Sequence, residues 1–298
     1  RPGISNTRVA GFQVVAGFLF GLGSLVRPIL LISCTMLILW RLMLNLNGPS
    51  GIRRNFAITI LPMIAAVMTI SPWIIRNAVC FGKFIPATTH GGYTLALGNN
   101  PDFYRDVIDG EIAFPWPGPQ LDTWQQRMIA DSAAQGVPVG NEPAQDSWYY
   151  RQAFASMTAQ PLSFLKSCLL RLRRFCAMTP GTNDGMPQLA TTLVAMWYGF
   201  IGIGLVAAIG HSVSARLPTR NIFLRKRISM QPSHADLWLV VLSFMLLHSV
   251  YWTDARMRAP VMPVISIIAV AGLQTLIEFV SYITAGRFVR TIAEKNIP

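Results

Sequence analysis

The sequence is short of charge. Only 13% of its 298 residues are Asp, Glu, Lys or Arg and 52% are hydrophobic, whereas about 25% are charged in typical soluble domains. Over this length, such a composition cannot reflect one small buried element, and it requires a solvent that is itself apolar. The scarcity of charge therefore excludes an ordinary soluble domain.

Motifs of cofactor and metal chemistry are also missing. The four cysteines form no CxxC or Cys/His spacing, and no DxD pair, Ser/His/Asp triad or phosphate-cradling glycine loop occurs. We expect no metal and no cofactor. A disulfide from Cys80 to Cys168 or Cys176 requires that their segment is extracytoplasmic, and unpaired thiols are the alternative.

What the sequence has is long apolar runs. A membrane-spanning helix needs about 20 mostly apolar residues, and six runs qualify or nearly do. They are Val9–Val26, Ile29–Leu46, Phe56–Ile75, Leu189–Ile209, Leu237–Trp252 and Pro260–Ile283. We predict an all-α polytopic membrane protein with about six transmembrane helices.

The distribution of basic residues predicts the orientation. The net charge is +12, but the basic residues lie at the ends of apolar runs, so we expect no nucleic acid as partner. Most gather on one side, in both tails and in the stretch from Arg216 to Arg227, and Lys/Arg-rich loops are cytoplasmic. We therefore expect an inner or plasma membrane protein with both termini in the cytoplasm and residues 76–188 outside.

The chain then divides into spans 1–75, a mostly helical extracytoplasmic domain 76–188, and spans 189–298. Turn signals include Gly91-Gly92 and Gly98-Asn99-Asn100-Pro101. Helices are predicted from Leu121 to Ala134, from about Pro143 to Thr158 with a cap near Asn141, and from Pro161 to Met178.

The last of these helices, residues 161–178, is basic and amphipathic. On a helical plot the leucines fall on one side and the cations on the other. The cations are Lys166, Arg171, Arg173 and Arg174. Such a helix either anchors in the lipid interface or contacts the phosphate of a lipid-linked ligand.

Arginines also occur on the predicted outer face, against the positive-inside bias. Arg27 lies in the first turn, Arg76 after the third span, and Arg256 and Arg258 in the last turn. Each could extend to lipid head groups, but together they indicate a site for an anion, because guanidinium pairs with phosphate in a planar fork. Of the ten outer acids, nine lie in the long segment, where solvation is the ordinary explanation, so the catalytic residue stays unassigned.

Several segments resemble the GT-C glycosyltransferases, in particular the bacterial group similar to protein O-mannosyltransferases and lipid A aminoarabinose transferases. The resemblance rests on their order across residues 17 to 270. The segments are Gly17–Pro28, Ser71–Asn77, Gly82–Pro86, Gly91–Leu95, Gly98–Pro101 and Asp254–Pro263.

The resemblance implies a sugar donor carried on a polyprenyl phosphate, and transfer to an unidentified lipid, glycan or protein acceptor at the extracytoplasmic face. The family's outer-turn arginine is matched by Arg256 or Arg258. Supporting contacts to the donor phosphate are expected from Arg27, Arg76, Lys166, Arg173 and Arg174, and a lining of the site from His90, Tyr93, Asn99 and Asn100. In this family the catalytic acid follows the first span, so we expect it to be missing from this chain.

The sequence leaves two alternative functions open. A transporter or flippase for lipid-linked or anionic cargo predicts ionisable residues deep in the spans, where His248 is the one central candidate. A non-catalytic assembly subunit is the third reading.

Overall fold

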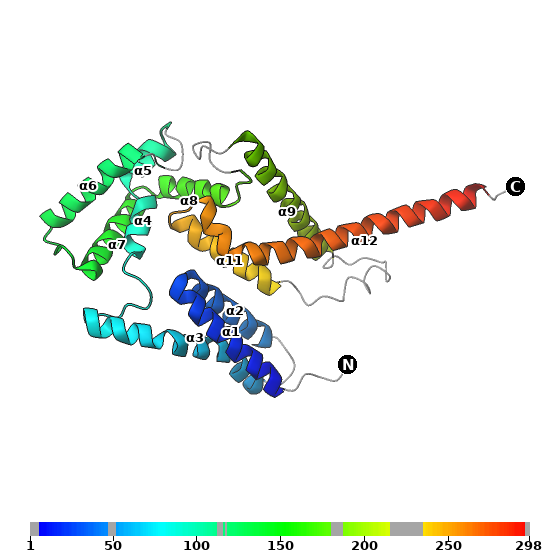
Figure 1. Ribbon diagram of the computed structural model, residues 1–298, viewed down its shortest axis with the longest axis horizontal. Helices are drawn as coiled ribbons and strands as arrows, with labels where there is room; N and C mark the ends of the chain where they lie inside the picture. Colours follow the sequence, from blue (N-terminus) through cyan, green and yellow to red (C-terminus); the bar gives the residue numbers. More distant parts are fainter. Residues whose placement is uncertain are drawn as a thin grey trace. The chain divides into compact units, whose positions relative to one another are not determined.

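A computed structural model describes residues 6–46, 52–111, 116, 118–179, 187–214 and 235–295. Within these ranges the regular structure is entirely helical (Figure 1). The chain divides into two compact units. The first holds residues 1–176 and 242–257, and the second holds residues 177–241 and 258–298.

Within the described residues, four helices are long and apolar enough to cross a membrane. They are α1 (Asn6–Val26), α3 (Ile52–Phe81), α9 (Gln188–Ser214) and α12 (Met262–Lys295). The apolar helices α2 (Ile29–Leu46) and α11 (Ala235–Val250) are shorter. All six expected runs are helical, and four of them meet the length of a span.

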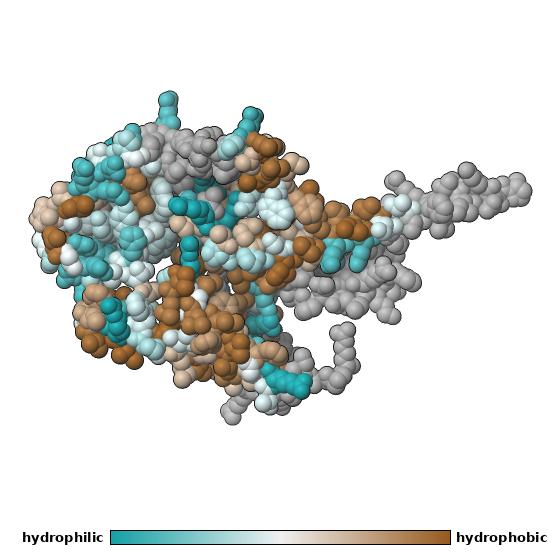
Figure 2. Space-filling view, viewed as in Figure 1, coloured by the Kyte–Doolittle hydropathy of each residue, from teal (hydrophilic) through white to brown (hydrophobic). Residues whose placement is uncertain are grey.

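The surface of the first three helices is hydrophobic, as Figure 2 shows for the face in view. Large apolar side chains such as Phe12, Val26 and Met68 are exposed on them. Exposed apolar faces of this extent need an apolar environment, which agrees with an integral membrane protein.

Small residues bring α1 and α3 together. A Cβ atom added to Gly17 would lie 2.2 Å from the carbonyl oxygen of Pro62, and one added to Gly21 would lie 2.6 Å from Cβ of Thr69. The Gly17-x-x-x-Gly21 spacing places both on one helix face, the arrangement that permits close packing of membrane helices. Ser33 of α2 and Ser243 of α11 add an interhelical hydrogen bond of 2.6 Å.

The segment between the apolar helices forms its own aromatic core. It contains α4 (Gly91–Gly98), α5 (Pro101–Phe103), the π-helical turn η1 (Tyr104–Ile108), α6 (Gly118–Ala134), α7 (Glu142–Ala159) and α8 (Pro161–Phe175). Phe103, Tyr104 and Trp124 are almost fully buried in it. The helices predicted at 121–134 and 143–158 are present, and the Asn141 side chain caps α7 by accepting from the Ala144 N–H.

Two local expectations change. Gly91-Gly92 is not a turn but the start of α4, where a Cβ on Gly92 would lie 2.1 Å from the Asp146 carbonyl oxygen of α7. The helix that begins at Pro161 ends at Phe175 rather than Met178. The basic loop from Arg216 to Arg227 lies outside the described residues.

In the second unit, α9 and α12 pack closely along each other. A Cβ on Gly272 would lie 1.9 Å from the Gly204 carbonyl oxygen, and one on Gly204 would lie 2.3 Å from that of Ala269. The last turn before α12 is the 3-10 helix η2 (Ala255–Val261).

We predict that Gly272→Ala destabilises the protein by about 2 kcal/mol, because the new methyl group meets helix backbone that cannot move aside. Thermal unfolding in detergent measures the change. The matched control is Gly199→Ala on α9, where an added Cβ has no neighbour within 4 Å. Equal unfolding midpoints for the two variants would contradict the close packing.

The native cysteines test the orientation. Cys80 and Cys176 are exposed and Cys34 is buried. We predict that a membrane-impermeant maleimide labels this protein in intact spheroplasts. Replacing Cys80 and Cys176 with serine should remove most of the label from the protein. Labelling that requires opened membranes would place residues 76–188 on the cytoplasmic side.

Candidate functional site

The first candidate region joins two turns of the first unit. Arg27 follows α1 and is half-buried, and its Nη1 contacts Sδ of Met257 at 3.4 Å. Next to Met257, the exposed Arg256 pairs with Asp254 at 2.8 Å. Two of the predicted phosphate-binding side chains therefore come from turns that touch each other.

Asp254 is held by more than this ion pair. One of its carboxylate oxygens accepts from the backbone N–H of Arg256 at 2.7 Å, and the other accepts from the guanidinium. Since the backbone bond fixes the carboxylate, the Arg256 side chain can leave it without releasing the turn.

Arg76 lies at the end of α3 and is exposed. Its guanidinium stacks over the Trp73 ring at 5.3 Å and donates to the Asn77 side chain at 3.1 Å. Asn77 in turn donates to the Ile85 carbonyl. Arg76 therefore belongs to the contacts that fasten the end of α3 to the loop after it.

The predicted basic residues of α8 lie in different environments. Lys166 pairs with Asp109 at 2.7 Å, and this contact lowers the pKa of the exposed Asp109 carboxyl. Arg173 is exposed and Arg174 is half-buried. These contacts do not bring the basic residues of α8 together with Arg27.

Arg258 belongs to the second unit and is buried, with 7% of its surface exposed. Its guanidinium lies 4.0 Å from the centre of the Tyr198 ring and donates to the Ala177 carbonyl. The side chain therefore fastens the start of this unit to α9. Its neighbour of the same motif, Arg256, remains on the surface.

The residues expected to line the site separate into two pairs. His90 is exposed, its ring lies 4.9 Å from that of Tyr93, and the Tyr93 hydroxyl accepts from Gln125 at 2.5 Å. Asn99 and Asn100 are buried. The Asn99 amide donates to the Leu95 and Val250 carbonyls, and Asn100 caps α5 by accepting from the Phe103 N–H, so both amides stabilise the fold.

Arg171, which the helical plot placed on the side of α8 opposite the leucines, makes several hydrogen bonds inside the protein. It is fully buried, and burial lowers its pKa. Its guanidinium donates to the carbonyls of Ser249 at 2.7 Å and Gly98 at 2.6 Å, and to side-chain oxygens of Asn99 and Ser167. A Cβ on Gly98 would lie 2.6 Å from Nη1, so a side chain at this position would displace the guanidinium from its acceptors.

Burial also changes the pKa values of Tyr104 and Asp146. It raises the pKa of the Tyr104 hydroxyl to about 12, although Arg171 acts in the other direction. It raises the pKa of Asp146, which accepts from the Gly92 N–H at 2.6 Å at the start of α4. Both groups hold helices together rather than face an open site.

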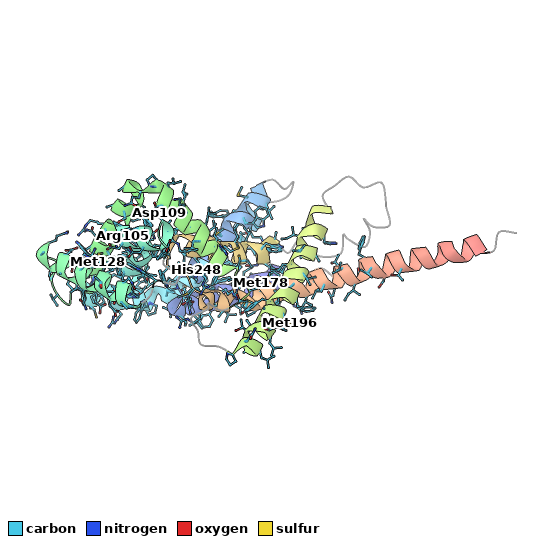
Figure 3. The ribbon with its side chains drawn as sticks, turned by 90° about the horizontal axis from the view of Figure 1, so that it is seen from above. Arg105, Asp109, Met128, Met178, Met196 and His248 are labelled. Atoms are coloured by element: carbon cyan, nitrogen blue, oxygen red, sulfur yellow. The ribbon has the colours of Figure 1, made fainter. Side chains whose placement is uncertain are left out.

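A shallow cleft of about 230 Å³ was not foreseen from the sequence. Asp102, expected to be solvated, is buried here and accepts from Arg105 at 2.9 Å and Arg127 at 2.7 Å. Figure 3 shows Arg105 and Met128 among the helices of this domain. Because each carboxylate is already paired, the cleft is an ion-pair network and offers no ready general base. Its charged and aromatic lining consists of Asp102, Arg105, Asp106, Trp116, Trp124 and Arg127.

The described residues contain no group of three or more His, Cys, Asp or Glu side chains that could hold a metal ion. The four cysteines are free thiols. Comparison with known proteins adds nothing further, since no family model, curated protein or solved structure matches this chain.

We predict that Arg171→Ala lowers the free energy of unfolding by about 3 kcal/mol or more, because it leaves several buried acceptors without a donor. Arg171→Lys is expected to restore little, since an ammonium group cannot reproduce the guanidinium fork. Tryptophan fluorescence during thermal unfolding measures both.

The control is Arg173→Ala, two residues along the same helix and exposed. We expect it to change stability by no more than about 0.5 kcal/mol. If the two alanine variants unfold alike, Arg171 does not support the fold in the way described.

Proposed function

We propose that this chain is the donor-binding part of a membrane glycosyltransferase. The enzyme takes a sugar from a polyprenyl-phosphate carrier and transfers it at the extracytoplasmic face to a lipid, glycan or protein acceptor. The observation that carries the proposal is the contact of Arg27 with the turn that holds Arg256. Residues from two predicted outer turns, far apart in the sequence, thus lie together beside apolar helices.

Charge favours a phosphate as the ligand. Arg27 and Arg256 each carry a positive charge, and Arg256 is paired with the carboxylate of Asp254. Guanidinium groups stay charged and bind phosphate oxygens in pairs, and a lipid carrier delivers its phosphate at the level where membrane helices end. In group transfer, positive charge there would also stabilise the departing lipid phosphate.

The proposal includes six spans, with both termini in the cytoplasm and residues 76–188 outside. It adds α2 and α11 to the four long helices. The 16 residues of α11 are about 24 Å long as a helix, against about 30 Å for the hydrocarbon core. The hydrogen bond between Ser33 and Ser243 supports the placement of both short helices side by side in the apolar layer.

The direct test is binding of a radiolabelled polyprenyl-phosphate sugar to the full chain in proteoliposomes. We expect Arg27→Gln and Arg256→Gln each to weaken binding about tenfold, the effect of losing one charge-assisted hydrogen bond. Arg258→Gln is expected to lower the stability of the protein, because that side chain is buried against Tyr198.

The control is Arg151→Gln on α7, which removes one exposed positive charge elsewhere. Unfolding curves of all variants separate a loss of binding from a loss of structure. If the Arg27 and Arg256 variants bind donor as well as the Arg151 variant does, the donor-phosphate site is not here.

A further inference from the structure

One face of α8 points away from the protein and is mainly apolar. Leu162, Leu165 and Leu169 are 66%, 58% and 67% exposed. Lys166 and Arg173 are exposed on the same face. These positions are spaced by three or four residues, so they form one continuous stripe on the helix.

The opposite face fixes the rotation of the helix. Ser167, Arg171 and Phe175 are buried. Arg171 donates to the Ser249 carbonyl, and the Phe175 ring stacks on His248 at 5.9 Å. Because these contacts hold the polar Arg171 inward, the leucines cannot turn into the protein interior.

The same contacts place α8 beside the C-terminal end of the apolar helix α11. Ser249 and His248 lie in the last turn of α11, a mainly apolar helix that ends at Val250. An element attached to the end of a membrane helix lies at the boundary between hydrocarbon and water. The leucine stripe therefore emerges at the depth where an amphipathic helix can enter the lipid interface.

The charges on α8 favour anionic head groups. The helix contains no acidic residue. Lys166 forms an ion pair with Asp109, the residue that follows η1. Arg173 is exposed and lies two residues before the end of α8. A face that combines leucines with cations and lacks acids matches the surface of a membrane that contains negatively charged lipid.

We propose that the stripe of Leu162, Leu165, Lys166, Leu169 and Arg173 is embedded in the interface of a bilayer that contains anionic lipid. The stripe anchors the domain formed by α4 to α8 to the membrane surface. The proposal rests on the proposed placement of α11 in the membrane, but not on the transferase activity.

The test uses the full chain in lipid nanodiscs with its four cysteines replaced by serine. An environment-sensitive NBD label is attached at Leu165→Cys and, as a matched control, at Ile129→Cys on α6, which is 64% exposed. We expect blue-shifted emission at position 165, and quenching there by lipids that carry bromine on the upper acyl chain. Position 129 should report water and show no quenching.

The outcomes are distinct. Quenching by brominated lipid at position 165 alone supports the proposal. Water-like emission at both positions overturns it. A blue shift at 165 without lipid quenching also overturns it, because the stripe is then covered by protein, either another part of the chain or a second copy. Unfolding curves of the labelled variants confirm that each is folded.

A second comparison tests the charge. Nanodiscs of phosphatidylcholine alone are compared with discs that also contain phosphatidylglycerol. We expect the anionic lipid to increase quenching at position 165, and Arg173→Gln to remove about half of that increase. Arg151→Gln on α7 should leave it unchanged. No dependence on lipid charge in any variant would overturn the assignment to anionic lipid.

Discussion

The buried guanidinium of Arg171 determines the arrangement of the first unit. It reaches two other segments of the chain, one through the carbonyl of Gly98 and the side chain of Asn99, and the other through the carbonyl of Ser249. Both carbonyls belong to the last turns of helices, α4 and α11, where backbone oxygens have no partner within the helix and carry partial negative charge. One cation therefore satisfies two helix ends at once, which an apolar side chain of the same size could not do.

This interaction explains features that are otherwise unrelated. The guanidinium fills the space beside Gly98, and because it donates to the Asn99 side-chain oxygen, the Asn99 amide nitrogen can donate to the Leu95 and Val250 carbonyls. By holding one face of α8 inward, it also directs the three leucines outward. A polar contact in the interior thus sets the position of an apolar surface.

The apolar runs and the helix signals were enough to predict most of the helices. Asn141 and Pro143 marked the start of α7, and Pro161 marked that of α8, since caps and first-turn prolines act locally. The face that α8 buries could not be predicted in the same way. The helical plot assigned all four cations to the side opposite the leucines, which is wrong for Lys166 and Arg173, because both lie exposed on the leucine face, whereas Arg171 is buried opposite it. The plot also does not say which side meets the protein, and here a partner was needed for Arg171 that only the folded chain supplies. The one available signal was Ser167, a small polar residue one turn before Arg171.

The predicted cations illustrate the same limit. Arg256 and Arg258 are two residues apart in the sequence, yet one is exposed and the other is buried on the Tyr198 ring. Spacing alone gave them equal weight as phosphate ligands. Their surroundings distinguish them, because a buried guanidinium already stacked on an aromatic ring would have to break that contact to reach a ligand.

Arg256 is in a different position, and Asp254 explains why. The carboxylate accepts from the backbone N–H of Arg256 as well as from its guanidinium. A phosphate bound beside Arg27 would compete for the side-chain bond to Asp254, while the backbone bond keeps the turn in shape. The Arg256 side chain is 87% exposed and that of Asp254 is 19% exposed. Because water screens the exposed guanidinium, this pair is weaker than a fully buried one. The pairing of Arg256 with Asp254 is therefore compatible with a ligand-binding arginine, whereas the burial of Arg258 argues for a structural one.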